Sequence, residues 1–164
     1  MKRENYDKIR AWFLRTPRCL LLLRAAYKGL PLIVATSYPL CLLLCFLYQR
    51  ELFLRAVIVP ALLFLLITLI RHQFNFPRPY EREKIIPLIQ RQKKGHSFPS
   101  RHTASAGIIA AVWMAYWYPA GITMIMITFF IAVSRVLAGV HDVRDVAFGG
   151  VVGFIAARIF FIFP

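Results

Sequence analysis

Long apolar stretches separated by short polar intervals dominate the chain. Residues 30–48 and 52–70 are two such runs, and they flank a polar turn at 49–51. The run 103–134 carries no charged residue and is too long for one helix, so Tyr118-Pro-Ala-Gly121 predicts a break between two helices. A helix needs about 20 apolar residues to cross the hydrocarbon core. The pattern therefore predicts an all-α integral membrane bundle of about five spans, at residues 30–48, 52–70, 103–118, 121–138 and 146–163.

The first 29 residues are basic and amphipathic. On a helical projection the cations gather on one side, and Trp12 and Phe13 belong to the apolar side. An arginine at the bilayer centre costs about 3 kcal/mol. We therefore expect residues 1–29 to lie in the headgroup layer, with Pro17 kinking or dividing them; a sixth span would require this segment to cross the membrane.

Composition agrees with a single membrane domain over residues 1–164. The chain is 59% hydrophobic with a mean hydropathy of +0.60, and it carries a formal net charge of +14. Such a charge favours anionic lipid headgroups or a phosphorylated substrate as partners, whereas the hydropathy argues against nucleic acid. Cys19, Cys41 and Cys45 lie among leucines without metal-ligand spacing.

Three polar clusters stand at the ends of the expected spans. They are Arg71–Pro79, Phe98–His102 and Ser134–Asp145, and the loop 71–102 that joins the first two is basic and contains proline. The order of the spans places all three clusters on one face of the membrane. Charge inside or beside the hydrocarbon is costly, and charged residues there usually serve a function. We therefore interpret the three clusters as parts of one active site.

The residue types in these clusters suit phosphate chemistry. Guanidinium groups neutralise phosphate oxygens, and Arg71, Arg78 and Arg135 are available for this task. The Ser100 hydroxyl and the free amides of Arg101 and His102 at the start of a helix form a further anion site.

Two histidines complete the predicted chemistry. His141 and Asp145 are four residues apart, so on one helical face the carboxylate can orient the ring for nucleophilic attack. His102 is the candidate general acid for the leaving group. This chemistry requires no metal and no cofactor.

The motifs Arg71-x6-Arg78-Pro79, Pro99-Ser100-x-His102 and Ser134-Arg135-x5-His141-x3-Asp145 resemble the three signatures of the type 2 phosphatidic acid phosphatase (PAP2) superfamily. The resemblance implies a metal-independent helical membrane phosphatase that acts on lipid phosphates or pyrophosphates through a phosphohistidine intermediate. It makes His141 the nucleophile, Asp145 its orienting partner and His102 the proton donor, with the phosphate held by Arg71, Arg78, Ser100 and Arg135. Two positions depart from the pattern: Arg71 replaces a lysine, and Arg101 replaces a glycine and adds a possible fourth phosphate-binding cation.

Several alternatives stay open at this stage. Undecaprenyl pyrophosphate is the favoured substrate, with phosphatidylglycerophosphate and phosphatidate as alternatives, and a non-catalytic lipid-binding membrane protein is the rival of another class. Members of the PAP2 superfamily commonly have the active site on the extracytoplasmic side of the cell membrane, and the resemblance implies the same location here. The positive-inside rule opposes this choice, because eight Lys and Arg precede residue 30 and eight lie between 71 and 101.

Overall fold

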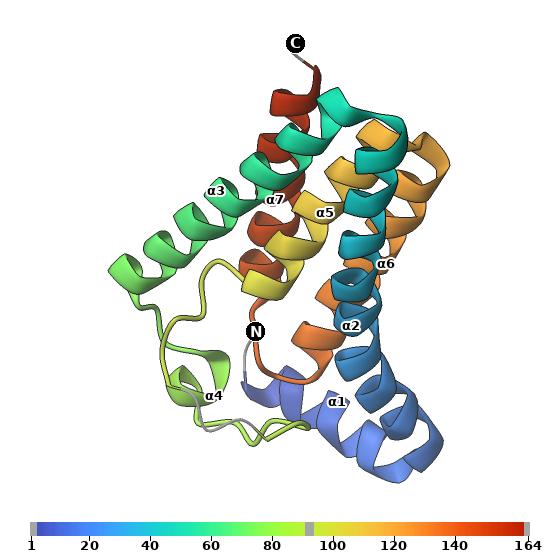
Figure 1. Ribbon diagram of the computed structural model, residues 1–164. Coiled ribbons are helices and arrows are strands. Elements are labelled where there is room, and N and C mark those ends of the chain that lie inside the picture. The colour runs from blue at the N-terminus through green and yellow to red at the C-terminus, as the bar shows by residue number, and fades with distance from the viewer. Residues whose placement is uncertain (1–2, 91–93, 163–164) are drawn as a thin grey trace.

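The fold is a bundle of helices (Figure 1). The computed structural model describes residues 3–90 and 94–162, so the ends of the expected 1–29 and 146–163 segments and three residues of the 71–102 loop lie outside the described residues. The part of the chain that is described contains helices and loops but no strand. The helices are α1 (Arg3–Arg15), α2 (Pro17–Tyr48), α3 (Arg50–Phe74), α4 (Pro79–Arg82), α5 (Arg101–Tyr116), α6 (Tyr118–Leu137) and α7 (Val143–Ile162).

The predicted fold class is confirmed, and the N-terminal segment is divided at Pro17, one of the two outcomes expected there. Helix α1 ends at Arg15, and residues 17–29 are the first turns of the 32-residue helix α2; the location of this segment in the headgroup layer stays a prediction. Pro17 divides the segment because proline, which lacks an N–H, is well placed as the first residue of a helix. Nothing after Pro17 breaks the helix, which continues into the span expected from residue 30.

The other helices extend or shift the expected spans by a few residues. Helix α3 runs on to Phe74, where Asn75 adopts a left-handed cap with φ 38°. Helix α7 begins at Val143, three residues before the expected start at 146. In the described part of the chain, four helices are long and apolar enough to cross a membrane, namely α2, α3, α6 and α7.

Helix α5 forms the centre of the bundle. It has only 16 residues and is rich in alanine, and most of its residues are buried. It packs directly on α7, whose glycines allow the two backbones to approach: a Cβ built on Gly153 would lie 2.6 Å from the Ala104 carbonyl oxygen. The shortest of the five bundle helices is thus covered by the others.

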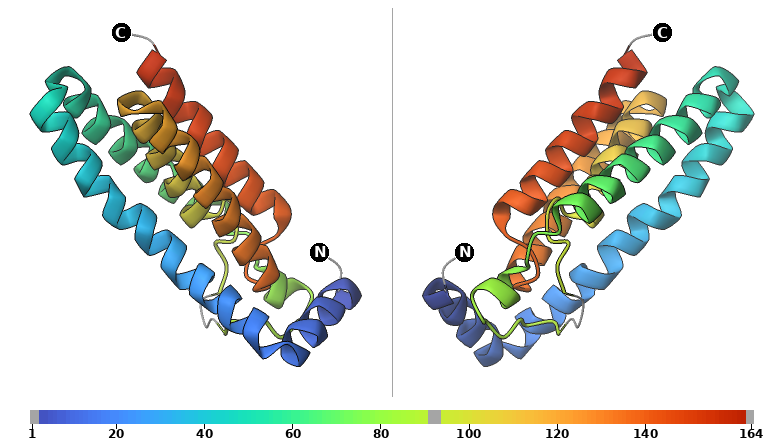
Figure 2. Two further views of the ribbon diagram at one scale, coloured as in Figure 1. Left: turned by 90° about the vertical axis from the view of Figure 1, so that its right-hand side faces the viewer. Right: turned by 90° about the vertical axis from the view of Figure 1, so that its left-hand side faces the viewer.

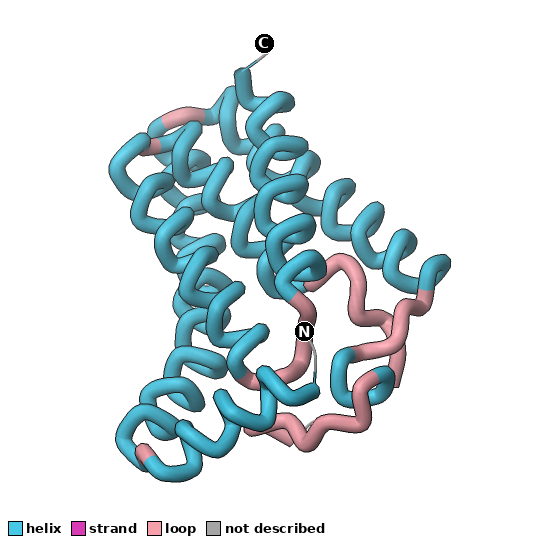
Figure 3. The backbone as a smooth tube through the Cα atoms, turned by 180° about the vertical axis from the view of Figure 1, so that it is seen from behind, coloured by secondary structure: helices cyan, strands magenta, loops and turns pink. Residues whose placement is uncertain are grey.

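The two ends of the bundle differ in character. The α2–α3 turn and the C-terminal end of α7 lie at one end, whereas α1, α4 and the long loop lie at the other (Figure 1, Figure 3). Helices α2 and α3 diverge from their common turn toward this second end (Figure 2). The polar clusters of the sequence all reach this end.

Candidate active site

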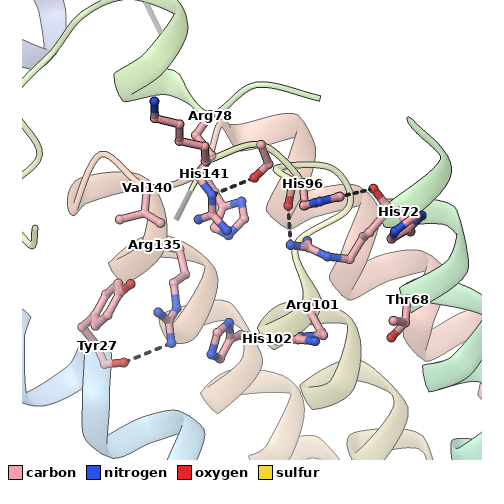
Figure 4. Close-up of a pocket in the computed structure, with 13 residues that line it drawn as sticks. Tyr27, Thr68, His72, Arg78, His96, Arg101, His102, Arg135, Val140 and His141 are labelled. Carbon is pink, nitrogen blue, oxygen red and sulfur yellow. Dashed lines mark hydrogen bonds between the residues drawn. The ribbon is translucent and has the colours of Figure 1, made fainter. Parts of the chain in front are cut away.

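A cavity of about 410 Å³ opens among α2, α3, α5, α6 and the two loops at the polar end of the bundle. Side chains from all three polar clusters line it (Figure 4), and they include Arg71, Arg78, Arg101, His102, Arg135 and His141. Ser100 and Asp145 are buried behind this surface and do not line it.

His141 stands on the short connection between α6 and α7. Gly139, with φ +75°, turns the chain there, and the Val140 amide donates to the Arg135 carbonyl, which brings His141 back beside the end of α6. The early start of α7 places Asp145 within reach, with its Oδ2 atom 3.6 Å from Nδ1 of His141. Since Nδ1 faces this carboxylate, Nε2 is the ring atom left for chemistry in the cavity.

Asp145 Oδ2 is also held by two other groups. The Ser97 hydroxyl donates to it at 2.5 Å, and the Asp142 amide donates to it at 3.2 Å. Ser97 is buried and its oxygen lies 3.5 Å from Nδ1 of His141. Carboxylate, hydroxyl and imidazole therefore form one connected group that fixes the orientation of the ring.

Arg71 and Arg78 fasten the loop that forms one wall. The Arg71 guanidinium donates to the carbonyl oxygens of Pro99 and His96, and Nε of Arg78 donates to the Gly95 carbonyl at 3.0 Å. One Arg78 nitrogen, Nη1, is buried without a hydrogen-bond partner among the described residues. A buried cationic donor of this kind is satisfied when an anion enters the cavity.

Arg135 is buried against Tyr27 of α2. Its guanidinium carbon lies 3.7 Å from the centre of the Tyr27 ring, and Nη2 donates to the Tyr27 carbonyl at 3.1 Å (Figure 4). Both contacts hold the cation in one place without neutralising its charge.

The start of α5 supplies the third side of the site. Ser100 precedes the helix, and its amide donates to the Asp145 carbonyl at 2.8 Å, while its buried hydroxyl has no partner among the described residues. Arg101 and His102 begin the helix, where the dipole favours an anion. The Arg101 guanidinium carbon lies 5.9 Å from the centre of the Phe64 ring. Arg101 also lines an adjoining groove between α2, α3, α5 and α6.

Two residues of the site lack a sequence signal. Ser97 stands just outside the second motif, and Tyr27 lies in the segment expected to rest on the membrane surface. His72 and His96 also line the cavity, with their rings stacked and the ring centres 5.7 Å apart; His72 is exposed and His96 is half-buried. Only the tertiary fold brings these side chains to the site.

The surroundings of His141 lower the pKa of its ring. Burial, with a contribution from the nearby Arg78 charge, lowers the pKa of His141 below its ordinary value of 6.5, although the hydrogen bond to Asp145 acts in the opposite direction. The ring is therefore a neutral base at neutral pH.

Among the described residues, no three His, Cys, Asp or Glu side chains gather in a way that would hold a metal ion.

A membrane bundle with a buried histidine–aspartate pair and several arginines around one cavity defines a membrane hydrolase for phosphorylated substrates. The chain belongs to the PAP2 superfamily, whose family model matches residues 52–164. It is accordingly a PAP2-type membrane phosphatase.

The solved structures that resemble this chain include those of two bacterial phosphatases. The crystal structure of Aquifex aeolicus LpxE superposes with a TM-score of 0.61 and 26% sequence identity, over 88% of this chain and 94% of that chain. A PAP2-type phosphatidylglycerolphosphate phosphatase from Bacillus subtilis superposes with a TM-score of 0.44 and 20% identity, over 94% of this chain and 90% of that chain.

Proposed function

We propose that this phosphatase hydrolyses a lipid pyrophosphate through a covalent phosphohistidine on His141. Nε2 attacks the terminal phosphorus, the bond between phosphorus and the bridging oxygen breaks, and His102 gives its proton to the departing oxygen. A water molecule then gives a proton to His102 and attacks the phosphorus, which releases inorganic phosphate and restores the free imidazole. The pair formed by Asp145 and Ser97 keeps the ring oriented through both steps.

The arginines supply the charge that this reaction needs. Arg71, Arg78, Arg101 and Arg135 line the cavity together with Lys94. No acidic residue is among the described residues of this lining, so the cations face one another across the space that a phosphate would fill. Preorganised cations of this kind stabilise the charge on transferring phosphoryl oxygens without a metal ion. Their number favours a pyrophosphate over a monoester, because the pyrophosphate carries more negative charge.

A lipid substrate is supported by one observation above all. A mostly apolar groove of about 350 Å³ shares Arg101 and His102 with the cavity and continues between α2, α3, α5 and α6. Its remaining lining is Pro31, Val34, Ala35, Phe64, Ser105, Ala106, Ile109 and Ile131. Because α2 and α3 diverge at this end, a lipid chain in the groove stays within the bilayer while its phosphate reaches the arginines (Figure 2).

We take undecaprenyl pyrophosphate as the substrate, since it combines a single apolar chain with a pyrophosphate. Phosphatidylglycerophosphate and phosphatidate are the alternatives. The test compares kcat/KM for the three lipids in mixed micelles, by release of inorganic phosphate. A higher kcat/KM for either glycerolipid would replace the pyrophosphate assignment and leave the mechanism in place.

Replacement of His141 tests whether the protein is an enzyme that uses this residue as its nucleophile. His141→Ala should lower phosphate release by about a thousandfold or more, because the nucleophile is lost, while the thermal unfolding temperature stays near that of the parent. His72→Ala, which removes an exposed ring at the cavity rim, is the matched control and should keep most of the activity. A non-catalytic lipid-binding protein would show no phosphate release in the parent, and equal activity in parent and His141→Ala would exclude the phosphohistidine.

We also propose that the cavity faces the extracytoplasmic side of the cell membrane. Five cations at this end, Arg71, Arg78, Lys94, Arg101 and Arg135, line the cavity, and phosphate binding would account for their position. Cations kept for binding reduce the number that the positive-inside rule should count.

A further inference from the structure

A second groove lies at the corner where α1, the first turns of α2 and the loop after α4 meet. Its volume is about 680 Å³, and among the described residues none lines both this groove and the catalytic cavity. Figure 1 and Figure 3 show the loop passing alongside α1 at the polar end of the bundle. We call it the α1–α2 groove.

Its chemistry is that of an amphiphile site. Arg10 of α1 and Arg24 and Lys28 of α2 supply three cations, and the described lining contains no acidic side chain. Arg24 and Lys28 are four residues apart on one helix, a spacing at which like charges repel unless an anion lies between them. The apolar part of the lining is unusually open: Leu14 is 53%, Leu21 68% and Ile86 59% exposed.

The walls of the groove are fixed by packing behind it. Phe13 of α1, Leu23 of α2 and Leu88 of the loop form one buried cluster. Tyr6, which is fully buried, accepts a hydrogen bond from the Leu88 amide at 2.9 Å and donates one to the Ala138 carbonyl at 3.1 Å. The groove is therefore preformed, so a ligand does not need to order its walls.

We propose that the α1–α2 groove binds an anionic phospholipid of the surrounding bilayer, with the headgroup phosphate on the three cations and an acyl chain along the exposed leucines. A soluble anion would leave these leucines in water, whereas a zwitterionic lipid would place its own cation beside Arg24 and Lys28. No histidine is among the described residues of the lining, so the groove holds its lipid without a nucleophile or proton donor like those of the catalytic cavity. The lipid is thus a bound component of the enzyme and not its substrate.

Native mass spectrometry of the full-length protein, titrated with phosphatidylglycerol or phosphatidylcholine, tests the proposal. It measures the affinity for each lipid and does not depend on phosphatase activity. Each cation near a phosphate headgroup accounts for about fivefold in affinity, so the triple variant Arg10→Gln, Arg24→Gln, Lys28→Gln should bind phosphatidylglycerol about a hundredfold more weakly. The matched control replaces Lys8, Arg15 and Arg18 by glutamine, which removes the same charge from exposed positions on α1 and α2 that do not line the groove. This control should keep the bound lipid.

A third variant separates the two sites. Arg135→Gln removes a cation from the catalytic cavity and should leave phosphatidylglycerol binding in the α1–α2 groove unchanged. Equal losses in the groove variant and the control variant would overturn the proposal, since binding would then follow total charge. Loss of the lipid in Arg135→Gln, or equally tight binding of phosphatidylcholine to the parent, would overturn it as well.

Discussion

At the scale of single residues, Asp145 Oδ2 receives the Ser97 hydroxyl and the Asp142 amide while it faces His141. The carboxylate is almost fully buried, so each donor offsets part of the cost of removing its charge from water. Ser97 is the donor that also reaches the histidine ring, which makes it a positioning residue for the proposed nucleophile.

Ser97→Ala should lower kcat by about tenfold to a hundredfold, because a hydrogen bond to a charged group contributes about 1.5–3 kcal/mol. KM should change little, since Ser97 does not line the cavity. Phosphate release at saturating lipid measures the effect. Ser134→Ala is the control: this serine is also buried, but it donates to Ile131 within α6. Equal kcat values for the two variants would contradict the positioning role.

The lowered pKa of His141 predicts the acid side of the pH profile. In the proposed mechanism the neutral ring is the attacking form, so kcat/KM should hold from neutral pH down to a value below 6.5 and fall only beneath it. The same shift means that proton binding favours the unfolded chain, so the free energy of unfolding should decrease as the pH falls through 6.5.

Carbon-13 NMR of histidine-labelled protein checks this prediction directly. The His141 signal is identified by its absence in His141→Gln. A titration midpoint above pH 6.5 in the free enzyme would be inconsistent with the burial of the ring. Arg78→Gln should raise the midpoint, because the Arg78 charge contributes to the shift.

At the scale of helices, the contact between α5 and α7 positions the residues of the site relative to one another. Helix α5 holds Arg101 and His102 at its start, and α7 holds Asp145 in its first turn. The two helices share a glycine-lined interface, so their separation sets the distance between His102 on α5 and Asp145 on α7, two of the proposed catalytic residues.

Gly153→Ala should destabilise the protein by about 1–3 kcal/mol, because the new methyl group would lie 2.6 Å from the Ala104 carbonyl oxygen and force α7 away from α5. Gly29→Ala is the matched control. No atom lies within 4 Å of a Cβ at Gly29, and alanine is the better helix former by about 0.5–1 kcal/mol, so this variant should be slightly more stable. Thermal unfolding in detergent distinguishes the two, and similar shifts for both variants would argue against a tight interface.

The helix ends near the site could be located from sequence because charge is costly in hydrocarbon and therefore marks where a span stops. Arg71, Arg135 and Asp145 stand at such ends. The start of α2 could not be located in this way, since Arg18 and Arg24 interrupt its apolar run. A helix of 32 residues is about 48 Å long, well beyond the roughly 30 Å of the hydrocarbon core, so its first turns can carry cations outside the lipid.

The roles of Ser97 and Tyr27 in the site could not be predicted from the sequence, for a different reason. Ser97 meets His141 across 44 positions and Tyr27 meets Arg135 across 108. No local spacing encodes such pairs, because they depend on how α2, the loop and α6 are placed by packing elsewhere.

At the scale of the whole molecule, charge is distributed unequally between the ends of the bundle. Among the described residues, seven Lys and Arg precede residue 30 and six lie between 71 and 101, whereas Arg50, Arg55 and Arg158 lie toward the opposite end. The asymmetry fits a site that collects anionic lipids from the bilayer surface. It also sets the positive-inside rule against the extracytoplasmic placement proposed above.

Cysteine labelling in intact cells resolves the placement. On a background without Cys19, Cys41 and Cys45, a cysteine at exposed Lys84 should react with a membrane-impermeant maleimide from outside, because it follows α4 at the polar end. A cysteine at exposed Gln49, in the turn at the opposite end, should react only after the membrane is permeabilised. The reverse pattern would place the active site on the cytoplasmic side.

The hydrogen bonds of Tyr6 have a consequence for how the protein is made. Its two backbone partners, at positions 88 and 138, leave the ribosome long after α1 does. Helix α1 therefore cannot make these contacts until α6 and the residue that follows it have been synthesised. The contacts of α1 must form late in assembly, after helices α2 to α6 have been produced.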